Sequence, residues 1–104
     1  MAIRLLESAK EDLRDGWLFY ERSSIGLGDY FLDCIQVDVR SLTTYAGIHE
    51  RAEGFHRMLA KRFPFAIYYL VDAETIDVYA ILDCRRDPEW IIKRLAKSRT
   101  KYAP

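Results

Sequence analysis

The chain has 104 residues, of which 50% are hydrophobic and 31% are charged, a balance typical of one small globular domain spanning residues 1–104. Its 16 basic residues equal its 16 acidic ones, which argues against a protein whose binding depends on a large positive charge. No apolar stretch approaches the roughly 20 residues of a membrane span, and the N-terminal region is too charged for a signal peptide. We therefore expect a cytoplasmic protein with no membrane partner.

The positions of the charged residues and the cysteines indicate which partners and which metal sites can be expected. From Arg85 onward the chain has seven basic residues and two acidic ones, which indicates a local patch facing a nucleic acid, an acidic protein segment or only solvent. Cys34 and Cys84 match no metal-binding spacing and are predicted to be buried, reduced thiols. With only two histidines, His49 and His56, no metal centre and no cofactor are expected.

The N-terminal half predicts a strand followed by a helical hairpin. Residues 2–6 form a short apolar run that can pair as a strand. Ser8 and Glu11 have the spacing of a capping box, and helical periodicity then continues to about residue 23. A second amphipathic pattern covers residues 27–45, and the short link between the two predicts antiparallel helices.

The C-terminal half changes to strand periodicity. Residues 55–60, 63–71 and 75–83 are predicted strands, and the second is apolar on both faces, as a central strand is. Asp87 followed by Pro88 is a strong helix start. The last helix is expected to dock on the body through Trp90, Ile91 and Leu95. The predicted class is therefore α+β, with the order β-α-α-β-β-β-α and a mostly antiparallel sheet packed against the helical hairpin.

Several of these segments together resemble the RelE/ParE superfamily, the toxins of bacterial type II toxin–antitoxin systems and plasmid stabilisation modules. The matching segments are Arg57, Arg62-Phe63-Pro64-Phe65, Ile67-Tyr68-Tyr69, Arg86-Asp87-Pro88 with Trp90 and Arg94, and, more loosely, Gly28-Asp29-Tyr30-Phe31. The resemblance implies a toxin that inhibits growth when free. It also implies neutralisation by a cognate antitoxin, in a dimer or a heterotetramer.

The superfamily divides by target, and the division can be examined in this sequence. RelE-like members cut messenger RNA on the ribosome without a metal, which would require cations around the phosphate: Arg57, Arg62, Arg85 and Arg86, with Lys61 as a further donor. Many relatives place a histidine where this chain has Asp83, and an aspartate is a poor acid at neutral pH. We expect Asp83 instead to orient Arg85 or to end its strand.

ParE-like members bind DNA gyrase and perform no chemistry of their own. The missing histidine and the zero net charge favour the ParE-like division over the RelE-like one. Contacts to the target or the antitoxin are then expected from the loop and from the exposed face of the last helix: Lys61, Arg62, Lys93, Arg94 and Lys97. A third alternative is a non-toxic relative that only binds its antitoxin and regulates its operon.

Some candidate residues also have structural interpretations. Arg57 can be an edge-strand arginine paired with a helix carboxylate. His49 and His56 are expected to be ordinary exposed or half-buried residues, and Tyr68 and Tyr69 are expected in the core.

Overall fold

The computed structural model describes residues 1–102 and contains a five-stranded sheet with helices on both of its faces. The elements in chain order are β1 (Ala2–Leu5), α1 (Glu7–Ser23), α2 (Leu27–Arg40), α3 (Leu42–Tyr45), β2 (Arg51–Ala52), β3 (Phe55–Leu59), β4 (Phe65–Asp72), β5 (Thr75–Asp83) and α4 (Pro88–Lys101). None of the described helices is long and apolar enough to cross a membrane.

The strands lie in the order β1-β5-β4-β3-β2. β1 is parallel to β5, and the remaining neighbours are antiparallel, so the predicted α+β class and the mostly antiparallel sheet are confirmed. The segment predicted as the central strand is confirmed as β4, although it begins at Phe65 rather than at residue 63. The short strand β2 was not predicted, because two residues show no periodicity.

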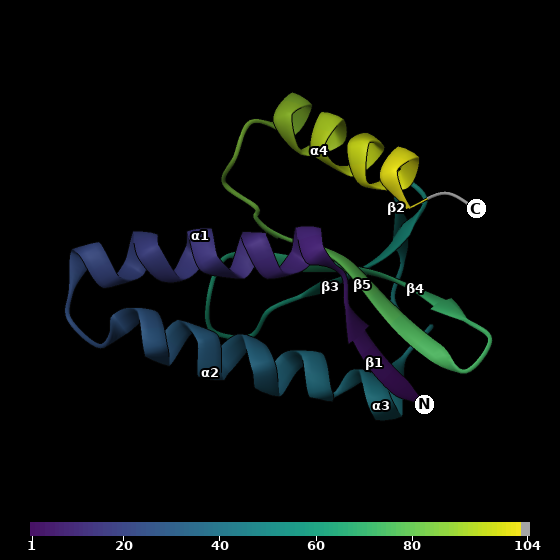
Figure 1. Ribbon diagram of the computed structural model, residues 1–104, viewed down its shortest axis with the longest axis horizontal. Helices are drawn as coiled ribbons and strands as arrows, with labels where there is room; N and C mark the ends of the chain where they lie inside the picture. Colours follow the sequence, from purple (N-terminus) through teal and green to yellow (C-terminus); the bar gives the residue numbers. More distant parts are fainter. Residues whose placement is uncertain (103–104) are drawn as a thin grey trace.

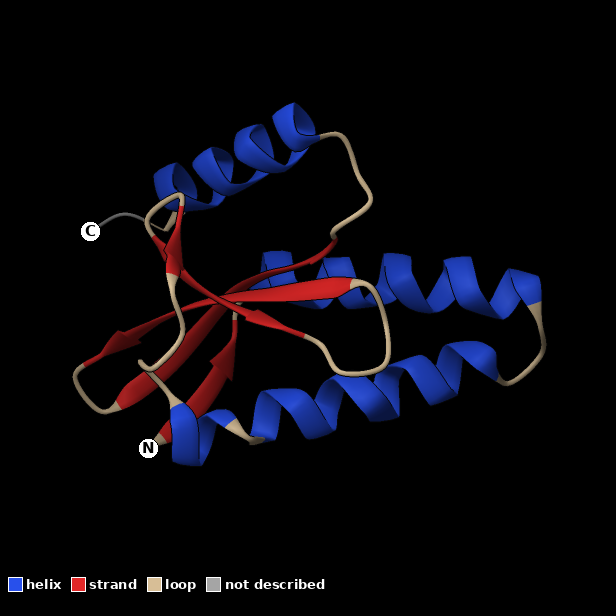
Figure 2. Ribbon diagram, turned by 180° about the vertical axis from the view of Figure 1, so that it is seen from behind, coloured by secondary structure: helices blue, strands red, loops and turns tan. Residues whose placement is uncertain are grey.

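Alternation along β4 divides the core into two layers. Phe65, Ile67 and Tyr69 face α1 and α2, whereas Ala66 and Tyr68 face α4. The hairpin of α1 and α2 therefore covers one face of the sheet and α4 covers part of the other, as Figures 1 and 2 show from opposite sides. The two adjacent tyrosines are both almost fully buried, as predicted.

The helical hairpin is held together where its helices approach closely. A Cβ on Gly16 would lie 2.6 Å from the Phe31 ring, so only glycine permits this contact. At the turn, the Glu21 carboxylate accepts hydrogen bonds from the Gly26 amide at 2.9 Å and the Gly28 amide at 2.9 Å. Glu21 thus satisfies donors at the start of α2 that no helical carbonyl can reach.

The second predicted helix is interrupted near its end. α2 stops at Arg40 and α3 resumes at Leu42, because the Ser41 hydroxyl donates to the Asp38 carbonyl at 2.6 Å and competes with the helical ladder. At the other end of the chain, the predicted start of α4 is confirmed, since the Asp87 carboxylate accepts from the Glu89 amide at 3.2 Å.

Where β1 ends, side chains of α1 form hydrogen bonds with the backbone groups of β5 that β1 no longer reaches. The Ser8 hydroxyl donates to the Tyr79 carbonyl at 2.7 Å. The predicted capping box is therefore wrong: α1 begins at Glu7, its N-cap Leu6 makes no side-chain cap, and the Ser8 hydroxyl is engaged with the sheet. One turn later, the Asp12 carboxylate accepts from the Ile81 amide at 3.0 Å. Two buried polar residues of the helix thus satisfy backbone groups that have no strand beside them.

Asp12 also joins α4 to this arrangement. Its carboxylate pairs with the Arg94 guanidinium at 2.8 Å, and Arg94 donates as well to the Ser8 carbonyl and the Ser98 hydroxyl. The expectation that Arg94 lies on the exposed face of the last helix is wrong, because its side chain is only 16% exposed. The docking of α4 through Leu95 and Ile91 is confirmed, whereas Trp90 lies at the surface.

The buried pair between Asp12 and Arg94 predicts that Arg94→Ala destabilises the fold by about 3 kcal/mol, since the substitution leaves a buried carboxylate without its counterion. Lys93→Ala, at the adjacent and exposed position of α4, is the matched control and should change stability by less than about 0.5 kcal/mol. Urea unfolding at pH 7 measures both. If Arg94→Ala reduced the free energy of unfolding as little as Lys93→Ala, the pair with Asp12 would not stabilise the fold.

Burial raises the pKa of Asp12 from 3.8 to about 6, although the Ile81 amide and the Arg94 guanidinium act in the opposite direction. Between pH 4 and 6 the folded chain therefore keeps a proton that the unfolded chain has lost, and stability falls as the pH rises through this window. At about 1.4 kcal/mol per unit of pKa shift, the full loss, from well below pH 4 to well above pH 6, is about 3 kcal/mol. About 2 kcal/mol of this loss falls between pH 4 and pH 7.

We expect the difference in unfolding free energy between the wild type and Asp12→Asn to fall by roughly this amount from pH 4 to pH 7. The asparagine does not titrate but keeps an acceptor for the Ile81 amide, so effects of other groups cancel in the difference. Urea unfolding across this pH range measures it. A difference that grows with pH would show that the pKa of Asp12 is lowered instead.

Candidate functional site

Three of the four arginines expected around a scissile phosphate, Arg57, Arg85 and Arg86, contact different partners in the structure. Arg57, on β3, donates through Nε to the Tyr68 hydroxyl at 3.3 Å and through Nη2 to Cys84 Sγ at 3.6 Å. The hydrogen bond to Tyr68 is the largest cause of the raised pKa of Arg57. The alternative prediction of a helix carboxylate as its partner is wrong, and Cys84, predicted to be buried, is a free and half-buried thiol, as is Cys34.

Arg85 is held by the residue that ends β5. Its guanidinium forms a two-point contact with Asp83, Nε to Oδ1 at 3.0 Å and Nη2 to Oδ2 at 2.7 Å, and it reaches the Tyr20 hydroxyl at 3.5 Å. The hydrogen bond to Arg85 lowers the pKa of Asp83. Asp83 therefore orients Arg85, as predicted. Because the Tyr20 ring packs against Phe31 and Phe65, Arg85 lies on the hairpin side of the sheet.

The remaining basic residues, Arg86, Lys61 and Arg62, lie in two other places: at the start of α4 and in the loop between β3 and β4. The Arg86 guanidinium lies over the Trp90 ring, 4.0 Å from its centroid. Lys61 and Arg62 are exposed in the loop between β3 and β4, where the Lys61 amide donates to the Asp38 carboxylate at 3.1 Å. Each of these basic residues thus has its own surroundings in the structure.

Both histidines belong to the hairpin side of the sheet. His56 stacks on the Tyr69 ring, with centroids 5.1 Å apart, and its Nδ1 hydrogen-bonds the His49 carbonyl at 2.8 Å. His49 Nδ1 forms a hydrogen bond with the Tyr69 hydroxyl. Burial lowers the pKa of His49. Since His56 and Arg57 are consecutive on β3, their side chains point to opposite faces. The half-buried histidines expected from the sequence thus support Tyr69 and do not lie beside Arg57.

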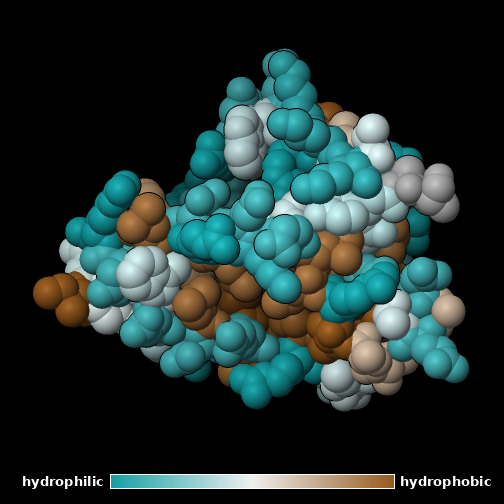
Figure 3. Space-filling model, viewed as in Figure 1, coloured by the Kyte–Doolittle hydropathy of each residue, from teal (hydrophilic) through white to brown (hydrophobic). Residues whose placement is uncertain are grey.

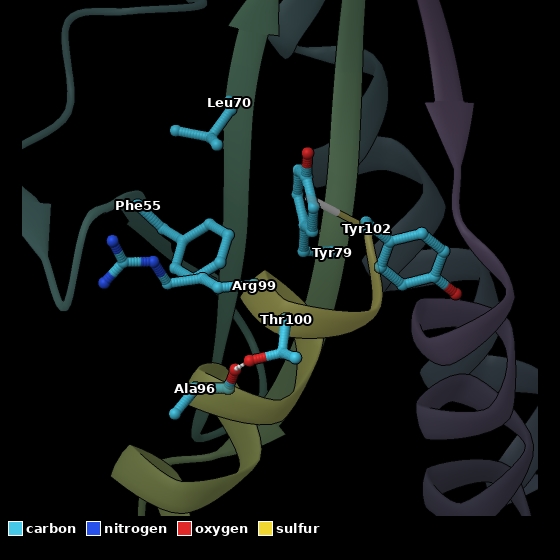
Figure 4. Close-up of a pocket in the computed structure, with 7 residues that line it drawn as sticks. All are labelled: Phe55, Leu70, Tyr79, Ala96, Arg99, Thr100 and Tyr102. Atoms are coloured by element: carbon cyan, nitrogen blue, oxygen red, sulfur yellow. Dashed lines mark hydrogen bonds between the residues drawn. The ribbon is translucent and has the colours of Figure 1, made fainter. Parts of the chain in front are cut away.

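A hollow opens on the α4 side, where the helix leaves the sheet partly uncovered. It has a volume of about 640 Å³ and is lined by Phe55, Leu70, Tyr79, Ala96, Arg99, Thr100 and Tyr102. We call this hollow the aromatic groove. Figure 4 shows the rings of Phe55 and Tyr79 side by side at its floor, with Arg99 extending past Phe55. The centroids of these two rings are 5.0 Å apart.

The edges of the aromatic groove combine apolar and cationic character. The Arg99 guanidinium closes one side, so near the turn between β2 and β3 that a Cβ on Gly54 would lie 3.0 Å from Nη1. Tyr102 closes another side, and its hydroxyl accepts from the Ser8 amide at 3.2 Å. Aromatic rings beside an arginine are the composition favoured at protein interfaces. Sequence analysis missed the residues of the aromatic groove, since they come from four separate elements, β3, β4, β5 and α4.

The outer face of α4 adds a second cationic surface. Lys93 and Lys97 are exposed there, as predicted, and line a shallow hollow together with Trp90 and Lys101. Within residues 1–102, no three His, Cys, Asp or Glu side chains lie close enough together to hold a metal ion. Both surfaces on α4 thus expose aromatic and cationic side chains together.

Comparison with known proteins identifies the fold. No model of a known protein family and no curated protein match the chain. One chain of the solved chromosomal ParDE TA system from P. aeruginosa aligns with a TM-score of 0.71 and 20% sequence identity, over 78% of this chain and 92% of that one. The two chains therefore share a fold across most of their lengths.

Proposed function

We propose that the chain is the toxin of a bacterial toxin–antitoxin pair, acting in the cytoplasm and neutralised by a cognate antitoxin. The observation that carries this proposal is the fold shared with the ParDE chain. The motif resemblance to the RelE/ParE superfamily adds independent support, because it rests on residues rather than on the backbone.

Within that class, the geometry favours a poison of a protein target, such as DNA gyrase, over a ribonuclease. Cleavage of RNA through its 2′-hydroxyl needs cations and proton donors around one phosphate. Here Arg57 lies on the α4 side and Arg85 on the hairpin side, while His49 and His56 are engaged with Tyr69. This placement of Arg57 and Arg85 on different faces supports a protein target over a shared phosphate site.

The surfaces available to a protein target lie on α4. The aromatic groove offers apolar rings with Arg99 at its edge, and the outer face of the helix offers Lys93 and Lys97. Lys61 and Arg62 remain proposed contacts for the target or the antitoxin, whereas Arg94 is withdrawn from this set because it pairs with Asp12. An acidic surface on the target fits this distribution of charge.

This proposal predicts that the purified chain inhibits supercoiling by DNA gyrase and that induction of the chain alone arrests growth. Reversing the charge at both Lys93 and Lys97 to Glu should weaken inhibition at least about tenfold, because the acidic surface of the target is then repelled. Arg14→Glu, an exposed reversal on α1, is the matched control and should inhibit like the wild type. Supercoiling of a relaxed plasmid is the measurement.

Two other results would each favour one of the alternative functions. If Arg57→Ala abolished growth arrest while folding normally, and the double lysine variant stayed fully active, the ribonuclease alternative would replace ours. If the wild-type chain left growth unchanged, the non-toxic, antitoxin-binding alternative would be favoured.

A further inference from the structure

The Arg99 guanidinium stands at the rim of the aromatic groove with part of its hydrogen-bonding capacity unused. Its one hydrogen bond within residues 1–102 runs from Nη1 to the Glu53 carbonyl at 3.5 Å. Among these residues, Nε and Nη2 have no acceptor, and Arg99 forms no ion pair. Because the side chain is exposed, this edge of the guanidinium is open to a partner.

Two other arginines of the chain show what this edge of a guanidinium binds. Arg4 donates through Nε and Nη2 to the two carboxylate oxygens of Asp77, at 3.0 and 2.9 Å. Arg85 contacts Asp83 through the same two nitrogens, at 3.0 and 2.7 Å. Two parallel charge-assisted hydrogen bonds give a carboxylate both affinity and a fixed orientation. The open edge of Arg99 is therefore suited to a carboxylate that another protein supplies.

The turn between β2 and β3 positions Arg99 and adds a second cation. The guanidinium lies so close to this turn that a Cβ on Gly54 would be 3.1 Å from Arg99 Cζ. Arg51 donates to the Gly54 carbonyl at 3.2 Å and forms no ion pair within residues 1–102. Glu53, exposed in the same turn, offsets one of the two positive charges. The remaining positive charge favours an acidic partner, and the contact with the turn reduces the entropy that Arg99 loses on binding.

Beside Arg99, the aromatic groove offers an apolar surface. Leu70 and Tyr79 are half-buried there, so both keep surface that a partner can cover. Apolar side chains that enter such a hollow beside an arginine commonly supply most of the binding energy of an interface. The groove thus combines a place for an apolar side chain with a place for a carboxylate.

The aromatic groove is continuous with the outer face of α4. Ala96 and Thr100 line both the groove and the outer hollow that contains Lys93 and Lys97. Figure 3 shows mainly hydrophilic surface over α4, whereas hydrophobic surface gathers between α1 and α2. One partner that lies across α4 would therefore reach both hollows, and a partner surface of mixed acidic and apolar character suits them.

We propose that the aromatic groove binds a segment of the protein target in which an apolar side chain and a carboxylate lie close together. The apolar side chain packs against Leu70 and Tyr79, and the carboxylate accepts from Nε and Nη2 of Arg99. The inference rests on the proposed function and deepens it, since it names the part of the target that is recognised. Nucleic acid is a poorer occupant, because the chain has no excess of positive charge.

Two substitutions of Arg99 test the carboxylate contact, with purified DNA gyrase as the probe and calorimetry in the absence of DNA as the measurement. Arg99→Lys keeps the charge but loses the two-point contact, so binding should weaken at least about fivefold. Arg99→Glu should weaken it at least about fiftyfold, through repulsion of the carboxylate. Arg22→Glu is the matched control, because both arginines are exposed in the last turn of their helices. Its affinity should stay within about twofold of the wild type.

A third substitution tests the apolar contact. Thr100→Phe places a ring in the aromatic groove and should weaken gyrase binding at least about fivefold, because the apolar side chain of the target is then excluded. Thr43→Phe is the matched control, since both threonines are exposed. Both hydroxyls also donate to a backbone carbonyl of the preceding turn, Thr43 to Arg40 at 2.9 Å and Thr100 to Ala96 at 3.1 Å. The control should bind like the wild type.

The possible results separate this inference from the proposed function. If both Arg99 variants bound gyrase like the wild type, the inference would be overturned while the proposed target stood. If Arg99→Glu weakened binding and Arg99→Lys did not, the two-point contact with a carboxylate would be wrong. Binding to plasmid DNA alone that the same variants weaken would overturn the choice of a protein segment. A wild-type chain that did not bind gyrase would overturn both the proposed target and this inference.

Discussion

The Asp12 carboxylate is the point on which the arrangement of the layers depends. It lies on α1, accepts a backbone amide of β5 and pairs with Arg94 of α4, so one side chain connects the hairpin, the sheet and the last helix. β1 ends before this point, and without Ser8 and Asp12 the β5 backbone would have buried groups with no partner. The pKa raised by burial indicates that this connection carries a desolvation cost.

This connection also determines which surfaces stay uncovered. Holding α4 near α1 leaves the far part of the sheet bare on that side, and the aromatic groove forms there. On the other side, a smaller hollow of about 330 Å³ lies between the hairpin and β1, lined by Ile3, Leu5, Leu13, Ile35, Gln36, Val39 and Arg40. Both hollows are thus places where a helical layer does not cover the sheet completely.

The sequence predicted what depends on local pattern. The two-faced apolar run of β4 and the Asp87-Pro88 start of α4 were recognised because periodicity and caps are encoded within a few residues. Ser8 and Arg94 were misassigned, since their partners lie 71 and 82 residues away in the chain and a helical wheel does not contain them. The aromatic groove was missed for the same reason. The sequence predicted the candidate arginines as phosphate contacts, but only the fold shows that Arg57 and Arg85 are on different sides of the sheet.

The central proposal is that the chain is a toxin that acts by binding a protein and not by cutting RNA. Mapping messenger RNA 5′ ends across the genome shortly after induction, without the antitoxin, tests it most directly. The account predicts growth arrest with no new 5′ ends. New ends at fixed positions within codons would contradict it, because the arginines would then have to gather around one phosphate on the ribosome.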